Sequence, residues 1–318
     1  MKKYRLAMLG TGDIANFHIE AFKKAGFEIN MCASKMNSKR AEQFANTHSI
    51  ENYYRDPFEL IKDHKNWDII LVAIRTEDNF QYLNEIIDLD KLCLIEKPVS
   101  TDLNLLKNYT GTSHPKIRVA YNRRFYKTMQ IAKTFINENS PVTCRMELPE
   151  GIDFQSNNKY DPVLLNTVHG IDLLRYFFGN LEIVNTTKLY SPEGRICTLK
   201  NKNNDKVSLL MNWNSPSNFS LNIEAKGKRL ELKPFETCKM YKGMDIIEPT
   251  DELPIRRYVP KEIMSTSSFP DSENNLKPGF YEQAIEMKNI LDNTTPKISA
   301  SLFDAYKTMK LTQDILNI

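Results

Sequence analysis

The stretch YRLAMLGTGDIA at residues 4–15 carries the strongest information about the fold. Residues 4–9 form a short apolar run typical of a strand, and residues 14–25 have the spacing of a helix that ends at Gly26. The glycines between them have the spacing GxGxxA in a strand-turn-helix context, which is typical of the start of a Rossmann dinucleotide-binding unit. An ordinary glycine turn is the alternative interpretation.

Each residue type in this loop suits a dinucleotide. Gly10 permits the tight turn, Gly12 lets the backbone approach a pyrophosphate, and the small Ala15 lets the helix pack closely on the strand. Free amides at the helix N-terminus would hold the phosphate charge. The loop residues that we expect to contact the cofactor are Gly10, Thr11, Gly12, Asp13 and Ile14.

Strand-like and helix-like segments alternate through about the first 120 residues. The run DIILVAI at residues 68–74 is continuously apolar, as in a strand buried on both faces. Repeated β-α units of this kind predict a parallel sheet with helices on both sides. The other expected segments are strands at 28–33 and 92–95 and helices at 38–47 and 80–89.

The pattern changes after about residue 124. Several strand-like segments follow with few helices between them, so antiparallel pairing is expected. We therefore predict an α/β chain with a Rossmann domain at residues 1–123 and an α+β domain at residues 124–318 that has a mostly antiparallel sheet. Residues 260–278 are rich in Ser, Pro and Asn and are expected to form a loop. The expected strands are 142–148, 181–189, 206–214, 220–225 and 229–232, and helices are expected at 280–291 and 301–316.

Composition narrows the class of protein. With 318 residues and 41% hydrophobic content, the chain has the composition of an ordinary folded protein. Its net charge of only +3 argues against a protein that binds nucleic acid. No apolar run approaches the roughly 20 residues of a membrane span. The 5 cysteines contain no CxxC pair, which favours reduced thiols and a cytoplasmic location, and we expect no metal site.

The end of the second expected strand bears on the choice of dinucleotide. An NAD site usually places an acidic residue there, whereas this sequence has CASK at residues 32–35. Ser34, Lys35 and the nearby Arg40 could hydrogen-bond a 2′-phosphate, so we predict NADP in preference to NAD. Alternatively, Lys35 and Arg40 are solvated surface charges.

A lysine follows the strand expected at residues 92–95. Strand ends on this side of a parallel sheet form the ligand crevice, and Lys97 comes directly after Glu96 there. An ammonium group at that place can hydrogen-bond a substrate oxygen or stabilise developing negative charge. A solvated lysine is the alternative.

A histidine lies in the helix that we expect to begin at Asp161 and to end at Gly179. Asn166, His169 and Asp172 form a polar stripe along this otherwise apolar helix. A histidine in such a stripe suits general acid/base chemistry, because its reference pKa is near neutrality. A histidine satisfied by Asn166 or by a backbone carbonyl remains an equal alternative.

Four motifs in order resemble the glucose–fructose oxidoreductase / inositol dehydrogenase (Gfo/Idh/MocA) family. They are LGTGDIANFH at the start, IEKPVS at 95–100, YNRRF at 121–125 and NTVHGIDLLRYFFG at 166–179. The resemblance covers both domains. It implies a Rossmann domain followed by an open, mostly antiparallel sheet that commonly forms an oligomer interface, so a homodimer or homotetramer is expected. It also implies hydride transfer between the nicotinamide and a sugar, cyclitol or nucleotide-sugar.

The resemblance implies roles for particular residues. Lys97 would lie beside the nicotinamide and contact the reacting hydroxyl, and His169 would exchange the hydroxyl proton. The YNRRF segment would cross between the domains, with Arg123 or Arg124 near the cofactor or substrate. The full expected substrate set is Tyr121, Arg123, Arg124, Asn166 and Asp172, and the further expected cofactor contacts are Ala73, Arg75, Glu96, Lys97 and Asn122.

The sequence departs from the family pattern near the histidine. Many members have an Asp three or four residues before it, where this chain has Asn166 and Leu165. Residues 73–79 read AIRTEDN, where members often have a Pro and then a His. Arg75 in this segment would contact the cofactor or an anionic substrate group, or lie as a surface charge. His18 fits the family's GxGxxAxxH pattern and is interpreted as structural.

Two other functions stay open. One is an enzyme that oxidises its substrate transiently with a tightly held NAD, as glycosidases resembling this family do. The other is a regulatory protein that kept the dinucleotide fold and lost catalysis, which the amide at Asn166 would allow.

Overall fold

The computed structural model describes residues 3–110, 114–153, 155–189, 194–268 and 276–318. The chain divides into two compact units. The first comprises Met1–Phe125 and Pro270–Thr312, and the second comprises Tyr126–Phe269 and Gln313–Ile318.

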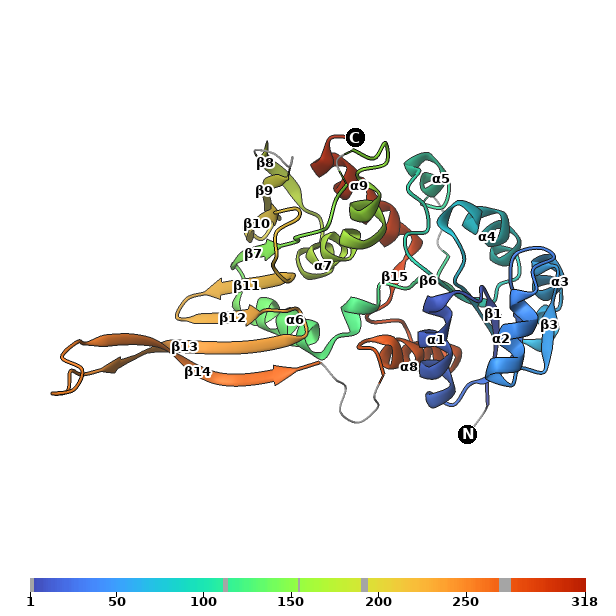
Figure 1. The fold of residues 1–318 in the computed structure, drawn as a ribbon, viewed down its shortest axis with the longest axis horizontal. Helices are drawn as coiled ribbons and strands as arrows, with labels where there is room; N and C mark the ends of the chain where they lie inside the picture. Colours follow the sequence, from blue (N-terminus) through green and yellow to red (C-terminus); the bar gives the residue numbers. More distant parts are fainter. Residues whose placement is uncertain (1–2, 111–113, 154, 190–193, 269–275) are drawn as a thin grey trace. The chain divides into compact units, whose positions relative to one another are not determined.

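The first unit is built on a mostly parallel sheet in the order β15-β6-β5-β4-β1-β2-β3 (Figure 1). Only the short β15 pairs antiparallel, with β6. Every residue of β4 and β5 is buried, as their continuous apolar sequences predict. The parallel Rossmann sheet is thus confirmed. Its strands are β1 Arg5–Leu9, β2 Glu28–Ala33, β3 Asn52–Tyr54, β4 Ile69–Val72, β5 Leu92–Ile95, β6 Ile117–Val119 and β15 Ala300–Ser301.

Helices follow most of these strands. Asp56 and Asp102 cap α3 and α5 by accepting hydrogen bonds from backbone amides of the first turn. The helices are α1 Asp13–Lys24, α2 Arg40–His48, α3 Pro57–Lys62, α4 Asn79–Ile87, α5 Leu103–Lys107, α8 Phe280–Leu291 and α9 Leu302–Leu316, with 3-10 turns η1 His64–Asn66, η2 Thr76–Asp78 and η3 Asn122–Phe125. The last turn of α9, from Gln313 on, belongs to the second unit.

Helix α8 packs in the first unit, although the sequence places it in the second predicted domain. It lies beside α1, and Phe280, Ala284 and Met287 belong to the hydrophobic core of the Rossmann sheet (Figure 1). The apolar face of a helix shows that it is buried but not against which sheet. The boundary between the units therefore differs from the predicted one, because the chain returns to the first unit near its C-terminal end.

The second unit is built on a sheet in the order β14-β13-β12-β11-β7-β10-β9-β8. All its neighbours pair antiparallel except β7 and β10, which confirms the mostly antiparallel prediction. Cys144 and Met146 alternate with exposed residues along β7, so one face of the sheet is buried. The strands are β7 Thr143–Glu147, β8 Glu182–Lys188, β9 Arg195–Lys200, β10 Lys206–Met211, β11 Ser220–Ala225, β12 Lys228–Leu232, β13 Thr237–Ile247 and β14 Arg257–Ser267.

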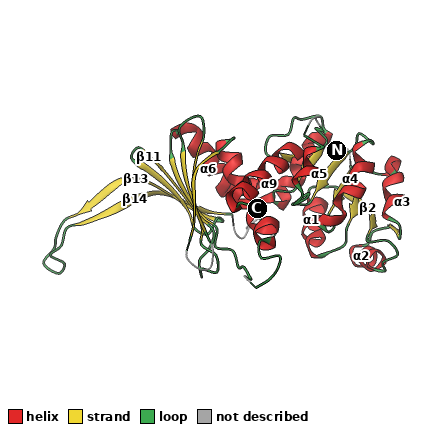
Figure 2. Cartoon of the chain, turned by 90° about the horizontal axis from the view of Figure 1, so that it is seen from above, coloured by secondary structure: helices red, strands yellow, loops and turns green. Residues whose placement is uncertain are grey.

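Two helices accompany this sheet. Helix α6, Lys127–Asn139, packs on β11, β12 and β14 (Figure 2). Helix α7, Val168–Phe178, follows a π-helical turn at Val163–Thr167 and ends where Gly179 adopts a positive φ of 71°, as predicted. A Cβ at Gly170 would lie 2.5 Å from Cδ2 of Leu148, so α7 is pressed against the chain that continues β7. This contact fixes the helix that carries the predicted histidine.

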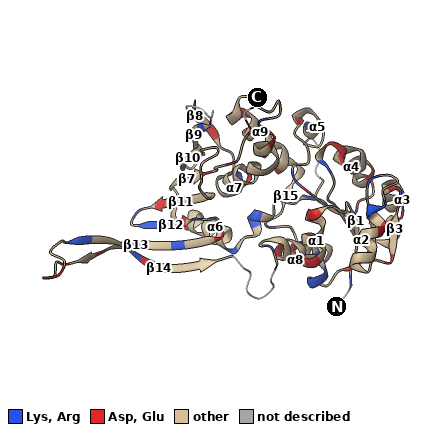
Figure 3. Ribbon diagram, viewed as in Figure 1, with Lys and Arg blue, Asp and Glu red and all other residues tan. Residues whose placement is uncertain are grey.

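The sequence prediction missed β9 and the long hairpin of β13 and β14. The loop expected at 260–278 is wrong for residues 260–267, which form part of β14, and residues 269–275 lie outside the described residues. Pro260 is tolerated because β14 is an edge strand, where a missing N–H is harmless. Charges of both signs occur along the hairpin and pair across it, as Lys239 does with Glu262 at 3.1 Å (Figure 3).

Two further observations concern the residues that the structure describes. None of their helices combines the length and the apolar character that crossing a bilayer requires. The five cysteines are all buried as free thiols.

Candidate functional site

The loop between β1 and α1 is held tightly against two neighbouring strands. The backbone N–H of Gly10 donates to the Ala33 carbonyl at 2.9 Å, and a Cβ at Gly10 would lie 2.1 Å from the Ala73 oxygen. Gly10 also has a φ of 115°, a backbone conformation that residues with a side chain rarely adopt. By contrast, a Cβ at Gly12 would meet no protein atom within 4 Å. The loop is therefore tight toward the protein at Gly10 and open at Gly12, which fits a ligand that lies against the backbone.

A cleft of about 470 Å³ opens beside this loop. Its wall brings together most of the predicted cofactor residues, from the ends of β1, β2 and β4. These are Gly10, Thr11, Gly12, Ser34, Lys35, Arg40, Ala73 and Arg75. Ser38, Asp78 and Tyr82 also line it and were not predicted, since nothing in their own sequence positions distinguishes them from ordinary polar and aromatic residues.

The charge of the cleft bears on the 2′-position of a dinucleotide. Thr11 donates to the Ser34 hydroxyl at 3.1 Å, so the loop and the end of β2 are joined there. Lys35 and Arg40 line the same wall, and Asp78, the acidic residue of the lining, comes from the 3-10 turn after β4. The end of β2 and the start of α2 therefore present a hydroxyl and two cations to the cleft.

The remaining predicted cofactor residues belong to the same unit but do not line the cleft. Asp13 and Ile14 begin α1. Asn122 donates to the Pro278 carbonyl at 3.2 Å, which holds the segment before α8. Glu96 and Lys97 follow directly after β5.

Glu96 is a fixed carboxylate. One oxygen lies 2.6 Å from Nε2 of His18, and the other accepts from the backbone N–H of Lys97 at 3.1 Å. His18 is fully buried, with its ring 4.7 Å from that of Phe280. The segment after Lys97 is also held, because the buried amide of Asn79 donates to the Val99 carbonyl at 3.1 Å. Lys97, half-buried itself, thus projects from a rigid strand end.

Lys277 lies close to this group and was not predicted, because it falls in the stretch expected to be a loop. Its Nζ lies 4.7 Å from the ring centroid of Phe17 and 5.4 Å from that of Phe280. Burial lowers the pKa of Lys277, while Glu96 acts in the opposite direction and Arg123 in the same direction. The sequence shows only a lysine shortly before a helix, which does not by itself indicate a site residue.

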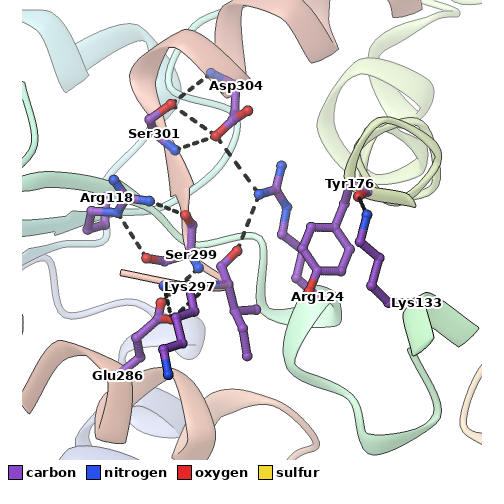
Figure 4. A network of polar contacts seen from close by, with 10 residues as sticks. Arg118, Arg124, Lys133, Tyr176, Glu286, Lys297, Ser299, Ser301 and Asp304 are labelled. Atoms are coloured by element: carbon purple, nitrogen blue, oxygen red, sulfur yellow. Dashed lines mark hydrogen bonds and ion pairs between the residues drawn. The ribbon is translucent and has the colours of Figure 1, made fainter. Parts of the chain in front are cut away.

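Arg124 belongs to a buried network within the first unit (Figure 4). Its guanidinium donates to the Ile298 carbonyl at 3.3 Å and lies 3.9 Å from the carboxylate of Asp304. The Tyr121 ring, predicted as a substrate contact, is buried with its centroid 6.0 Å from Cζ of Arg124. These contacts tie the segment after β6 to residues near the C-terminus. Arg123, the residue before Arg124, is partly buried.

The second unit carries the other predicted residues on and before α7. His169 and Asp172 are buried, with exposed fractions of 5% and 1%, whereas Asn166 is exposed. Asn166 donates through Nδ2 to Oε2 of Glu150 at 2.9 Å, and the Thr167 hydroxyl donates to the same oxygen. Glu150 was not predicted, because its contact with Asn166 spans 16 positions of sequence.

Among the described residues, no group of three or more His, Cys, Asp and Glu side chains is placed to hold a metal ion.

Residues 4–114 match the profile of the Gfo/Idh/MocA family, an oxidoreductase family with an NAD-binding Rossmann fold. The N-terminal part of the chain is thus similar to the Rossmann domain of that family. The matched residues contain the loop, the cleft and Lys97, so the match agrees with the geometry of the first unit.

Several proteins that are similar to this chain are dehydrogenases or oxidoreductases. The myo-inositol 2-dehydrogenase of Thermotoga maritima is 25% identical over 186 residues, which are 55% of this chain and 55% of that protein. The match thus spans about half the length of this curated relative. A levoglucosan dehydrogenase in complex with NADH has a TM-score of 0.77 at 15% identity, covering 99% of this chain and 96% of the other. An Agrobacterium radiobacter oxidoreductase in complex with NAD+, L-tartaric acid and magnesium has a TM-score of 0.75 at 16% identity, covering 99% and 96%. At such identities the structural likeness establishes the fold alone.

Proposed function

We propose that the protein is an NAD(P)-dependent dehydrogenase that acts on an alcohol or ketone carbon of a sugar, cyclitol or nucleotide-sugar. The observation that carries the proposal is the cleft beside the β1–α1 loop, tight at Gly10 and open at Gly12, which suits a pyrophosphate at the N-terminus of α1. The names of the myo-inositol 2-dehydrogenase and the levoglucosan dehydrogenase support a carbohydrate-like substrate.

The proposed chemistry is divided between two side chains. When bound, the nicotinamide exchanges a hydride with the substrate carbon. Lys97 contacts the reacting oxygen and stabilises the negative charge that develops there, since Glu96 and Asn79 hold the backbone on both sides of it. His169 takes the hydroxyl proton during oxidation and returns it during reduction. Asn166, Asp172 and Arg123 are proposed substrate contacts, and the assembly is proposed to be a homodimer or homotetramer.

The function is tested with a panel of sugars, cyclitols including myo-inositol, and nucleotide-sugars. We expect a change in nicotinamide absorbance with at least one member, together with an oxidised or reduced product. A hydrolysed product without net absorbance change would instead indicate transient oxidation by a tightly held cofactor. Dinucleotide binding without any product would contradict the dehydrogenase proposal and favour a regulatory protein.

We also propose NADP as the preferred dinucleotide. Replacing both Lys35 and Arg40 with alanine is expected to weaken NADPH binding about tenfold or more, because a hydrogen bond to a charged group contributes about 1.5–3 kcal/mol. NADH has no 2′-phosphate, so its dissociation constant should change little. Fluorescence titration of both cofactors measures the two constants.

The matched control for this pair is Lys39→Ala, which removes an exposed cation at the start of α2 that does not line the cleft. It should leave both constants unchanged. An equal loss of NADH and NADPH affinity in the double variant would show that the two cations do not contact the 2′-phosphate.

A further inference from the structure

Glu150 joins the end of β7 to the turn that precedes the histidine. Oε2 of Glu150 accepts from the Asn166 amide at 2.9 Å and from the Thr167 hydroxyl. Thr167 is buried and Asn166 is exposed, so the carboxylate reaches the surface of the π-helical turn beside α7. Asn166 lies in this turn, three positions before the buried His169 of α7. A carboxylate of this unit thereby holds the turn that leads into the helix carrying His169.

The backbone around Glu150 is fixed independently of its side chain. Its carbonyl accepts from the backbone N–H of Asn214 at 2.9 Å. The side chain of Asn214 then binds both backbone groups of Ile152, accepting at 2.8 Å and donating at 3.0 Å. Beside it, Leu148 is packed against Gly170 of α7. The carboxylate is therefore held at a set place along the helix.

The chemistry of the contact fixes the orientation of the amide. An ionised carboxylate only accepts hydrogen bonds, so the group of Asn166 that faces it is the NH₂ and not the carbonyl. The Asn166 carbonyl oxygen is consequently left as an acceptor for another donor. Hydrogen bonds to a charged partner are about twice as strong as neutral ones, and they polarise the groups that they join.

We propose that Glu150 is a positioning residue for the proton exchange at His169. Through Asn166 and Thr167 it holds the turn that leads into α7, and it orients the Asn166 amide so that a fixed, electron-rich carbonyl oxygen three positions before the histidine orders a donor N–H or a substrate hydroxyl. The inference rests on the proposed function, because it assigns a residue to the proposed acid/base step. It adds a carboxylate at a position that the sequence pattern does not mark.

The experiment compares Glu150→Gln, Asn166→Asp and the double variant with the wild-type enzyme on the substrate that the panel identifies. In Glu150→Gln the new side chain can turn its carbonyl to Asn166 but carries no charge, so kcat should fall about 10–100-fold, within the range of general acid–base contributions. KM and the cofactor dissociation constant should stay within about threefold. Asn166→Asp in the Glu150→Gln background returns a carboxylate to the turn three positions before His169, and kcat should recover about tenfold over Glu150→Gln alone.

The matched control is Glu147→Gln, a carboxyl removed from β7 on the same segment. It should leave kcat unchanged. Thermal melting distinguishes a positioning role from a loss of folding stability. The proposal is supported if Glu150→Gln lowers kcat at an unchanged Tm and Asn166→Asp restores kcat. In ¹⁵N-labelled protein, the side-chain NH₂ resonance of Asn166 should shift in Glu150→Gln and not in Glu147→Gln.

Three results would overturn the inference. They are an unchanged kcat in Glu150→Gln, a loss of kcat that Asn166→Asp does not rescue, and an Asn166 NH₂ resonance that does not shift in Glu150→Gln. Inactivity of the wild-type chain on the whole panel is a different failure, because it contradicts the proposed function and removes the role with it.

Discussion

Replacing Lys97 with alanine should lower kcat/KM by about 10²–10³-fold, the effect of removing one group that stabilises charge in a transition state. The dinucleotide dissociation constant should hardly change, since Lys97 does not line the cleft beside the loop. His169→Ala should lower kcat by about 10²–10⁴-fold through loss of the proton acceptor. Steady-state kinetics and cofactor titration together make the measurement.

Lys91→Ala is the control for Lys97. Lys91 lies at the other end of β5, where its ammonium donates to the Trp67 carbonyl at 3.0 Å. Lys91→Ala therefore removes a lysine next to the same strand and should leave turnover unchanged. If Lys97 and His169 act in one step, the double variant should lose less than the product of the two single losses, because residues that act as a unit are not additive. Unaffected turnover in both single variants would exclude the assigned mechanism.

The Rossmann sheet was predictable because its physical cause is local. Buried parallel strands have continuous apolar sequences, as in residues 68–74, and the GxGxxA spacing predicts the turn in which it lies. The long hairpin of β13 and β14 was not predictable in the same way. Met244, Ile246 and Tyr258 are all more than half exposed there, so hydrophobic alternation does not signal a buried face. Their strands exist because they pair with each other, which only the tertiary structure shows.

The residues of the candidate site likewise differ in whether their cause is local in sequence or lies in tertiary contacts. Residues of the cleft that belong to the loop and to strand ends were found, because topology places the carboxyl ends of parallel strands together. Glu150 and Lys277 were missed because each meets its partners through tertiary contact. Arg124 illustrates the opposite case, since its charge suggested a ligand contact and its guanidinium contacts Ile298, 174 positions away. Charge in a motif identifies a residue that needs a partner, without identifying the partner.

Gly10→Ala should damage both the fold of the first unit and dinucleotide binding. The new Cβ would lie 2.1 Å from the Ala73 carbonyl oxygen, and Ala73 cannot move away because its own N–H donates to the Leu9 carbonyl at 2.7 Å. The positive φ adds about 1–3 kcal/mol of backbone strain for a residue with a side chain. We expect a Tm lower by several degrees, since about 1 kcal/mol shifts Tm by about 2–4 °C in a domain of this size.

Gly12→Ala separates the two effects. Its Cβ would contact no protein atom within 4 Å, so the Tm should match the wild type. If a pyrophosphate lies against Gly12, however, the methyl group occupies the space that the phosphate needs, and the dissociation constant for NADPH or NADH should rise about tenfold or more, equivalent to about 1.4 kcal/mol. Thermal melting and fluorescence titration of the two variants are the measurements. A Gly12→Ala protein that melts normally and binds both dinucleotides with wild-type affinity would place the pyrophosphate away from this loop, and the function assigned to the cleft would fail with it.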